Sequence, residues 1–171
     1  RKLAMLQLYY HPGNASMTPH MLLEEIGAPF ELRLVDRANA SHKRPEYLNL
    51  NPNGLIPVLV DGELVLYETA AICLHLADTH PQAQLAPPMQ TAERAHFYKW
   101  LVWCTNTPQA MLMHYFYSER MVNDGDAAAA AQVRALARWA ESARSVRRCA
   151  LLRGRPGLAV HRCRSGKLAH G

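Results

Sequence analysis

The chain has 171 residues, a formal net charge of +5 at pH 7 and 49% hydrophobic residues. This length allows one sizeable core or two small domains. No run of about 18 apolar residues occurs, and the first residues lack a secretory signal, so we expect a cytoplasmic protein without membrane contact.

The basic charge is concentrated at one end of the chain. Residues 142–171 contain seven Arg, one Lys and no acidic residue, whereas residues 1–141 carry a net charge of −3. The net charge of the whole chain therefore does not indicate what kind of partner residues 1–141 bind. We expect no nucleic-acid partner.

The cysteines and histidines do not form a metal-binding pattern. The four cysteines are widely spaced and form no CxxC motif. Among nine scattered histidines, His11 and His20 come nearest to a cluster, and neither has a metal-ligand partner. We expect reduced thiols and no metal site.

The first elements alternate between strand and helix. An apolar and aromatic run at residues 5–10 ends at the loop 11–13, which predicts a buried strand. Thr18 then precedes a predicted helix over residues 19–26, with Gly27 as its C-cap.

A second strand and a hairpin follow. Alternation over residues 30–35 predicts a half-exposed strand, and we expect a short helix around residues 45–48. After a turn at Asn53-Gly54, apolar residues 58–60 and 64–66 flank Asp61-Gly62, which is typical of a β-hairpin.

The two ends of this hairpin have features of a binding site. Pro57 has no N–H group, so the backbone of Ile56 is expected to face outward, where an extended peptide can pair. Thr69 is the expected N-cap of a helix over residues 70–79. The N-terminus of this helix attracts a carboxylate and Glu68 attracts an ammonium group, which together suit the amino-acid end of glutathione. An ordinary hairpin followed by a capped helix is the alternative.

The remaining chain predicts helices. Residues 80–90, rich in Pro, Gln and Ala, are the expected interdomain linker. A long helix starts near residue 91, and Pro108 marks a kink or interruption. Residues 124–126 break the pattern before an Ala-rich helix over residues 127–143.

Three motifs resemble the glutathione S-transferase family. NPNGLIPVL and LYETAAI look like its glutathione-binding segments, and LYYHPGNASMTPHMLLEEIG is similar to bacterial, beta-like members. The resemblance spans residues 5–141, most strongly to about residue 80. It implies a thioredoxin-like α/β domain of order βαβ-ββα at 5–79, then an all-α domain at 91–141 that is truncated. It also implies a homodimer.

The resemblance assigns glutathione contacts to the hairpin region. It implies that Pro57 is cis, that the backbone of Ile56 pairs with the cysteinyl part of glutathione, and that Glu68 and Thr69 bind its γ-glutamyl end. Asn53, in the turn before Ile56, is a further candidate for contact with glutathione. Glutathione is then a co-substrate, and no bound cofactor is expected.

The thiol of glutathione must be activated where the first strand meets the first helix. A hydroxyl or amide donor beside a helix N-terminus stabilises a thiolate. We rank Ser16 first, then Tyr10, then Asn14, and each has a structural role in the loop or core as its alternative. Similar bacterial members have a cysteine where this chain has Ala15, so a mixed-disulfide mechanism is not supported.

The first helices after the linker form a second-substrate pocket and the dimer face in the resembling family. Trp103, Thr107, Met111 and Tyr115 are candidates for the wall of that pocket. Their alternative role is in the core of a helix bundle.

The implied activity is attack of the glutathione thiolate on a small, largely apolar electrophile, a detoxification reaction. Two other functions stay open: a noncatalytic binding or scaffold protein, and a glutathione-dependent isomerase. The tail 142–171 departs from the family and has no sustained helical period. We interpret it as a product of a changed reading frame, with a basic arm for RNA or anionic lipid as the alternative.

Overall fold

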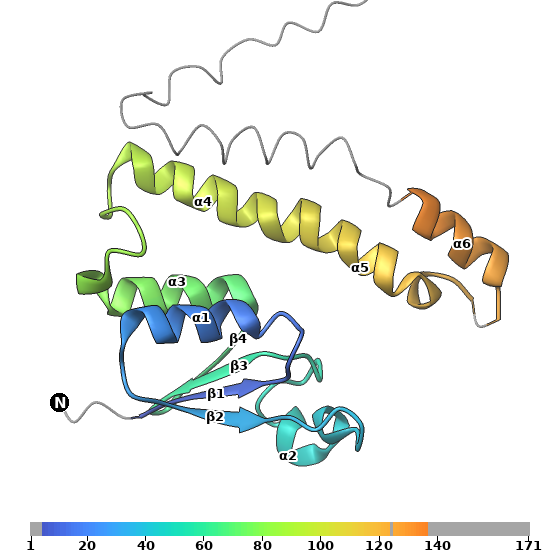
Figure 1. Cartoon of the computed structure of the whole chain (residues 1–171), viewed down its shortest axis with the longest axis horizontal. Coiled ribbons are helices and arrows are strands. Elements are labelled where there is room, and N and C mark those ends of the chain that lie inside the picture. The colour runs from blue at the N-terminus through green and yellow to red at the C-terminus, as the bar shows by residue number, and fades with distance from the viewer. Residues whose placement is uncertain (1–4, 124, 137–171) are drawn as a thin grey trace, which may run out of the picture. The chain divides into compact units, whose positions relative to one another are not determined.

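The computed structural model describes residues 5–123 and 125–136 (Figure 1). By its internal contacts the chain divides into two compact units, with the division after Thr105, and each is described by itself. The strands are β1 (Leu6–Tyr10), β2 (Phe30–Leu34), β3 (Val58–Asp61) and β4 (Leu64–Tyr67). The α-helices are α1 (Met17–Ile26), α2 (Pro45–Leu48), α3 (Thr69–Thr79), α4 (Ala92–Cys104), α5 (Ala110–Phe116) and α6 (Ala127–Leu136).

The four strands form one sheet in the order β2-β1-β3-β4. Strand β1 runs parallel to β2, whereas β3 runs antiparallel to both β1 and β4. A parallel pair needs a crossover connection, which α1 provides, and the antiparallel pair β3-β4 is joined by the turn at Gly62-Glu63. The thioredoxin-like order βαβ-ββα predicted from the sequence is confirmed.

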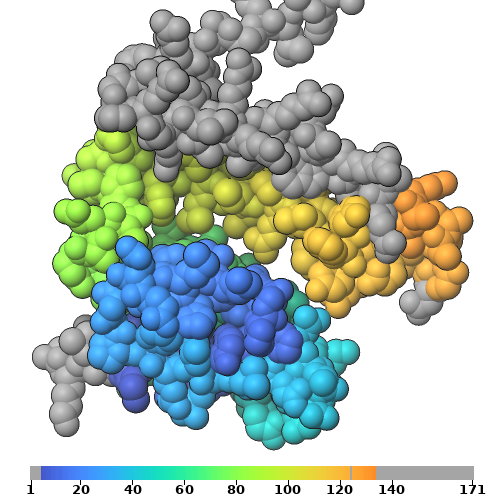
Figure 2. Space-filling view, in the orientation of Figure 1, coloured from blue at the N-terminus to red at the C-terminus, as the bar shows by residue number. Residues whose placement is uncertain are grey.

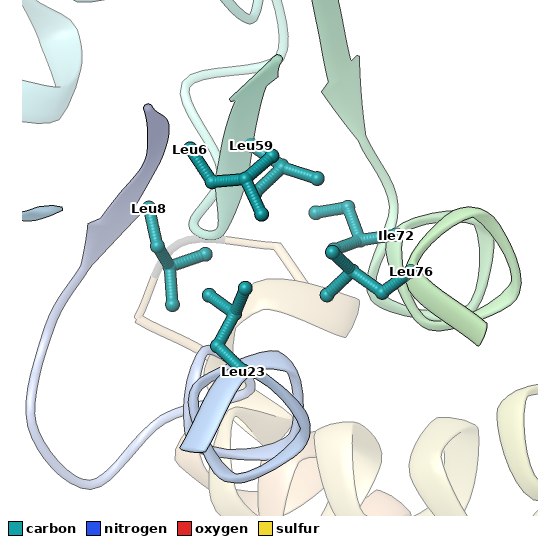
Figure 3. Close-up of a cluster of buried hydrophobic side chains, with 6 residues drawn as sticks. All are labelled: Leu6, Leu8, Leu23, Leu59, Ile72 and Leu76. Atoms are coloured by element: carbon teal, nitrogen blue, oxygen red, sulfur yellow. The ribbon is translucent and has the colours of Figure 1, made fainter. Parts of the chain in front are cut away.

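Helices α1 and α3 cover one face of the sheet, and the main apolar core lies beneath them. Leu6 and Leu8 are two residues apart on β1 and therefore point to the same face. Side chains from α1, β3 and α3 meet them there (Figure 3). The buried cluster consists of Leu6, Leu8, Leu23, Leu59, Ile72 and Leu76.

A second, smaller cluster lies around Tyr47, which anchors helix α2. Tyr47 is buried with Val35 and Val58, and Tyr9 packs against this group. The rings of Tyr9 and Tyr47 meet edge to face with 6.1 Å between their centroids. Burial raises the pKa of the Tyr47 hydroxyl, which donates to the carbonyl of Leu55 at 2.8 Å. The loop before β3 is thus held by a short helix that the sequence predicts only weakly.

Helix α1 begins earlier than the sequence predicts. Its first residue is Met17 and its N-cap is Ser16, whereas Pro19 was the expected start. Proline is tolerated there because N–H groups of the first helical turn have no partner within the helix. The predicted C-cap is confirmed: Gly27 has φ +69° and donates its N–H to the carbonyls of Leu23 and Glu24.

The expected N-cap of α3 is also displaced by one residue. Thr69 is the first helical residue, and Glu68 is the N-cap, so the prediction for Thr69 was wrong. Glu68 has φ +73° and ψ +114°, and its carbonyl accepts from the N–H of Ile72 at 3.0 Å. The turn out of β4 thus takes place at Glu68, and the helix is already established at Thr69.

The predicted interruption near Pro108 is present. Thr105–Gln109 form a π-helical segment that contains Pro108, as a proline inside a helix favours. Helix α4 begins at its predicted place, where the Thr91 hydroxyl accepts from the N–H of Arg94 at 3.2 Å. The expected linker at residues 80–90 contains a short 3-10 helix and lies within the first unit.

In the second unit, α5 and α6 contact each other and the 3-10 turn Ser118–Met121. Helix α6 is described to Leu136, so the rest of the predicted helix to residue 143 and the tail 142–171 lie outside the described residues. None of the helices that the structure describes has the length and apolar character needed to cross a membrane.

Candidate functional site

The candidate residues come together at one edge of the sheet. Tyr9 of β1 pairs with Arg33 of the parallel strand β2 and with Val58 of the antiparallel strand β3. Val58 in turn pairs with Tyr67 of β4. The ends of β1, β2 and β4 and the beginning of β3 therefore share this edge (Figure 1). Figure 2 shows the surface of α1 and its preceding loop, in blue, beside that of the α2 segment, in cyan.

Ser16, the first-ranked candidate for thiol activation, is buried and engaged within the loop. Only 1% of the residue's surface is exposed. The hydroxyl oxygen accepts from the backbone N–H of His11 at 3.2 Å and lies 3.0 Å from the carbonyl oxygen of His11. It also lies 2.6 Å from Oδ1 of Asn14. Ser16 therefore takes the loop-capping role that the sequence left open.

Asn14 is oriented by Ser16. Its Oδ1 accepts from the backbone N–H of Ser16 at 2.8 Å, in addition to the contact with the Ser16 hydroxyl. Because an N–H group needs an acceptor, the amide oxygen must be the atom on this side. The amide nitrogen of the half-buried Asn14 therefore points away from Ser16 and is a donor for an anion.

Tyr10 is half-buried at the end of β1 and packs against the main core cluster. Its ring centroid lies 6.1 Å from that of His20 on α1, which in turn lies 5.7 Å from the ring of Phe30. The aromatic contacts hold the Tyr10 ring in place. A phenolic hydroxyl is a second possible donor at the same sheet edge.

His11 is a further candidate residue at this edge, although the sequence indicates it only as one of two histidines that come nearest to a cluster. Its Nδ1 lies 3.0 Å from the carbonyl oxygen of Val35, just after β2. The two residues are 24 positions apart in the chain. No local sequence pattern signals such a contact, although the position directly after a buried strand is one where chemistry is expected in α/β folds.

The candidate peptide-binding segment lies directly before β3. The Ile56–Pro57 peptide bond is cis, as the resemblance implied. The carbonyl of Leu55 accepts from Nδ2 of Asn51 at 2.8 Å as well as from Tyr47. In the part of the chain that the structure describes, no hydrogen bond uses the backbone of Ile56. These groups are available to an extended peptide.

The turn and helix around this edge complete the candidate set. Asn53 is exposed, and its N–H donates to Oδ1 of the buried Asn51 at 3.1 Å. Glu68 is exposed at the N-terminus of α3, and Thr69 follows it in the first turn. The carboxylate of Glu68 and the free N–H groups of the helix offer opposite charges to a zwitterionic group.

The four second-substrate candidates fall in both units. Trp103 belongs to α4, and its ring meets that of Trp100 edge to face at 5.6 Å. Thr107, Met111 and Tyr115 lie beyond the division after Thr105. Met111 and Tyr115 are four residues apart on α5 and therefore share a side of that helix.

Comparisons with known proteins agree with this geometry. A family model described as "Glutathione S-transferase, N-terminal domain" matches residues 4–78. Glutathione S-transferase GST-4.5 of Xanthomonas campestris is 38% identical over 96 residues, which are 56% of this chain and 46% of that relative. BphK, a bacterial GST solved as a ternary complex, is 30% identical with a TM-score of 0.69, and the match covers 86% of this chain and 70% of BphK.

The chain belongs to the glutathione S-transferase family. A family member from Sulfitobacter, solved with bound glutathione, is 28% identical with a TM-score of 0.69, over 78% of this chain and 63% of that chain. The chain spans about half the length of the curated family members that it matches.

Proposed function

We propose that this chain binds glutathione at the sheet edge and transfers its thiolate to a small, largely apolar electrophile. The observation that carries the proposal is the convergence of three features at one edge. These are the backbone of Ile56 beside cis Pro57, which no hydrogen bond among the described residues uses, the N-terminus of α3 with Glu68, and the loop that presents Asn14. Each feature suits a different part of one tripeptide.

The amino-acid end of glutathione binds at α3 in this proposal. The exposed carboxylate of Glu68 takes the ammonium group, and the first N–H groups of α3, with Thr69, take the carboxylate. The backbone of Ile56 then pairs with the cysteinyl residue. Asn53 lies in the turn that leads to this edge and contacts the bound peptide from there.

The cysteinyl sulfur then lies near the loop between β1 and α1. The amide nitrogen of Asn14, with the Tyr10 hydroxyl as the second donor, stabilises the thiolate, which makes it a nucleophile at neutral pH. Ser16 acts by holding Asn14 in this orientation. The thiol of Cys73 is not a substitute nucleophile, because burial raises its pKa to about 11.

From the family likeness we propose second-substrate roles for Trp103 in the first unit and for Thr107, Met111 and Tyr115 in the second unit. The apolar parts of these side chains suit a largely apolar substrate. Homodimer formation, the domain border at residues 80–90 and a cytoplasmic site of action are proposed from the family likeness. The chain spans about half the length of its curated relatives, so its enzymatic activity is itself a proposal.

Calorimetric titration with glutathione tests the binding step, after circular dichroism has established that the chain is folded. We expect saturable one-site binding that Glu68→Ala abolishes. Glu63→Ala is the matched control, because Glu63 is also exposed but lies in the turn at the opposite edge of the sheet. No binding by the folded chain would refute the proposal. Binding without turnover against a panel of electrophiles would favour a noncatalytic binding protein.

A further inference from the structure

The imidazole of His11 is held in one tautomer by the end of β2. Its Nδ1 lies 3.0 Å from the carbonyl oxygen of Val35. A carbonyl oxygen only accepts, so Nδ1 carries the hydrogen of this bond. In the neutral ring, Nε2 is then the unprotonated nitrogen with a free lone pair. Within the described chain, no residue is hydrogen bonded to Nε2.

The backbone of His11 is tied to the group that orients Asn14. The Ser16 hydroxyl contacts both the N–H and the carbonyl oxygen of His11, at 3.2 and 3.0 Å, and also contacts Oδ1 of Asn14. One buried hydroxyl thus connects the two residues. The side chain of His11 is half-buried, so it is held firmly and still reaches solvent.

This arrangement offers a base and a hydrogen-bond donor at the same sheet edge. A thiol that becomes a thiolate must lose its proton to an acceptor, and neither Asn14 nor Ser16 is basic. The phenolic hydroxyl of Tyr10 serves as a hydrogen-bond donor. His11 is the residue of this loop whose side chain has a basic lone pair.

We propose that Nε2 of His11 is the proton acceptor for the thiol of bound glutathione. The inference rests on the proposed function and assigns it a catalytic residue. The S–H bond breaks, the proton forms a new bond to Nε2, and the electron pair stays on sulfur. The thiolate then attacks the electrophile and forms the carbon–sulfur bond. The proton on Nε2 passes to the leaving group or to water, which restores the neutral ring.

His11→Asn is the informative substitution. The side-chain nitrogen of Asn occupies about the position of Nδ1 and keeps the bond to Val35, whereas the basic nitrogen is removed. His96→Asn is the matched control, because His96 is exposed on α4 and contacts Lys99. Both variants are made in the full chain. The measurements are binding of S-methylglutathione, which has no thiol proton, and the pH dependence of kcat with glutathione and a chromogenic electrophile.

We expect His11→Asn to bind S-methylglutathione as the unmodified chain does. Its kcat at pH 7 should fall about a hundredfold, the typical contribution of a positioned base. The deficit should shrink as the pH rises past about 8.5, where a free thiol ionises without help. His96→Asn should leave both the binding and the pH profile unchanged.

Three distinguishable results would overturn the inference. If His11→Asn binds S-methylglutathione normally and keeps its kcat and pH profile, His11 is not the acceptor and the proposed function stands. A variant that mainly loses affinity for S-methylglutathione, with an unchanged pH profile, would also refute the assignment, since His11 would then hold the peptide. Failure of the unmodified chain to bind S-methylglutathione would refute the proposed function and the inference together.

Discussion

Arg94 of α4 donates to Asp78 near the end of α3, with 2.5 Å between Nη2 and Oδ1. Only 4% of the Arg94 surface is exposed. Its Nη1 donates to the carbonyl of Pro87 at 3.1 Å, so one guanidinium joins α3, the connecting segment and α4. A buried cation needs its counter-charge, which makes this pair a stability determinant of the first unit.

Asp78→Asn should therefore lower the free energy of unfolding by about 2 kcal/mol. The loss is smaller than for a fully buried pair because 44% of the Asp78 side chain is exposed. Chemical unfolding followed by circular dichroism measures the change. Glu63→Gln, an exposed carboxylate change in the β3-β4 turn, should alter stability by less than about 0.5 kcal/mol. Equal losses in the two variants would contradict this role.

Glu68 combines its proposed ligand role with an unfavourable backbone conformation. At φ +73° and ψ +114°, glycine is favoured over any other residue. Glu68→Gly should raise the free energy of unfolding by about 1 kcal/mol while abolishing glutathione binding. Glu68→Ala should abolish binding without the gain in stability. Unfolding curves and calorimetry on both variants check the prediction, which fails if the Gly variant is the less stable one.

Gly54 lies in the turn that leads to Ile56. It has φ +62°, and a Cβ there would come within 3.0 Å of the carbonyl oxygen of His42. Gly54→Ala should cost about 2–3 kcal/mol and weaken glutathione binding, because the turn must shift. Gly27→Ala has a similar φ of +69° but open space around the new methyl group, so it should cost about 1 kcal/mol. Calorimetry should show no loss of glutathione affinity for Gly27→Ala.

Kinetic measurements should distinguish the role of Ser16 from that of Asn14. Asn14→Asp keeps an acceptor for the Ser16 N–H but replaces the donor with a negative charge, so kcat should fall about 10²–10³-fold. Ser16→Ala keeps the Asn14 side-chain amide but removes the hydroxyl that orients it. This change should lower kcat about tenfold and leave KM for glutathione little changed. Steady-state kinetics with glutathione and a chromogenic electrophile tests both. A larger kcat loss for Ser16→Ala than for Asn14→Asp would make the Ser16 hydroxyl the direct donor.

Cys73 should make stability fall at alkaline pH. Burial raises the pKa of its thiol to about 11 in the folded chain, above the ordinary value of about 8.5 that it has when unfolded. The folded state thus keeps a proton that the unfolded state loses, so stability is full below about pH 8.5 and is lost as pH rises toward 11. Between pH 8 and pH 10.5, the free energy of unfolding should decrease less for Cys73→Val than for the unmodified chain. Equal decreases would mean that other groups, such as Tyr47, account for the loss.

Local sequence patterns predict most of the helices and strands of the first unit. The sequence predicts β1 from an apolar and aromatic run, β2 from alternation, the hairpin β3-β4 from its turn, and the end of α1 from Gly27. Each of these signals depends on residues close together in the chain. The cis bond at Pro57 was implied by the family resemblance of the motif around it, not by a local pattern. The starts of α1 and α3 were displaced by one or two residues. Ser16 already has helical backbone angles and is hydrogen bonded to the loop before α1, and Glu68 makes the turn out of β4 at φ +73°.

The sequence by itself therefore determined the order of the elements, the family and the segment that presents Ile56 and Glu68, since periodicity and short motifs carry this information. Only the tertiary structure decided how the loop between β1 and α1 is arranged. Burial of Ser16 withdraws its hydroxyl from a ligand and orients Asn14 instead. The bond from His11 to Val35 joins residues 24 positions apart, and pairing between parallel strands brings them together. Such contacts depend on register and packing, which no local pattern encodes.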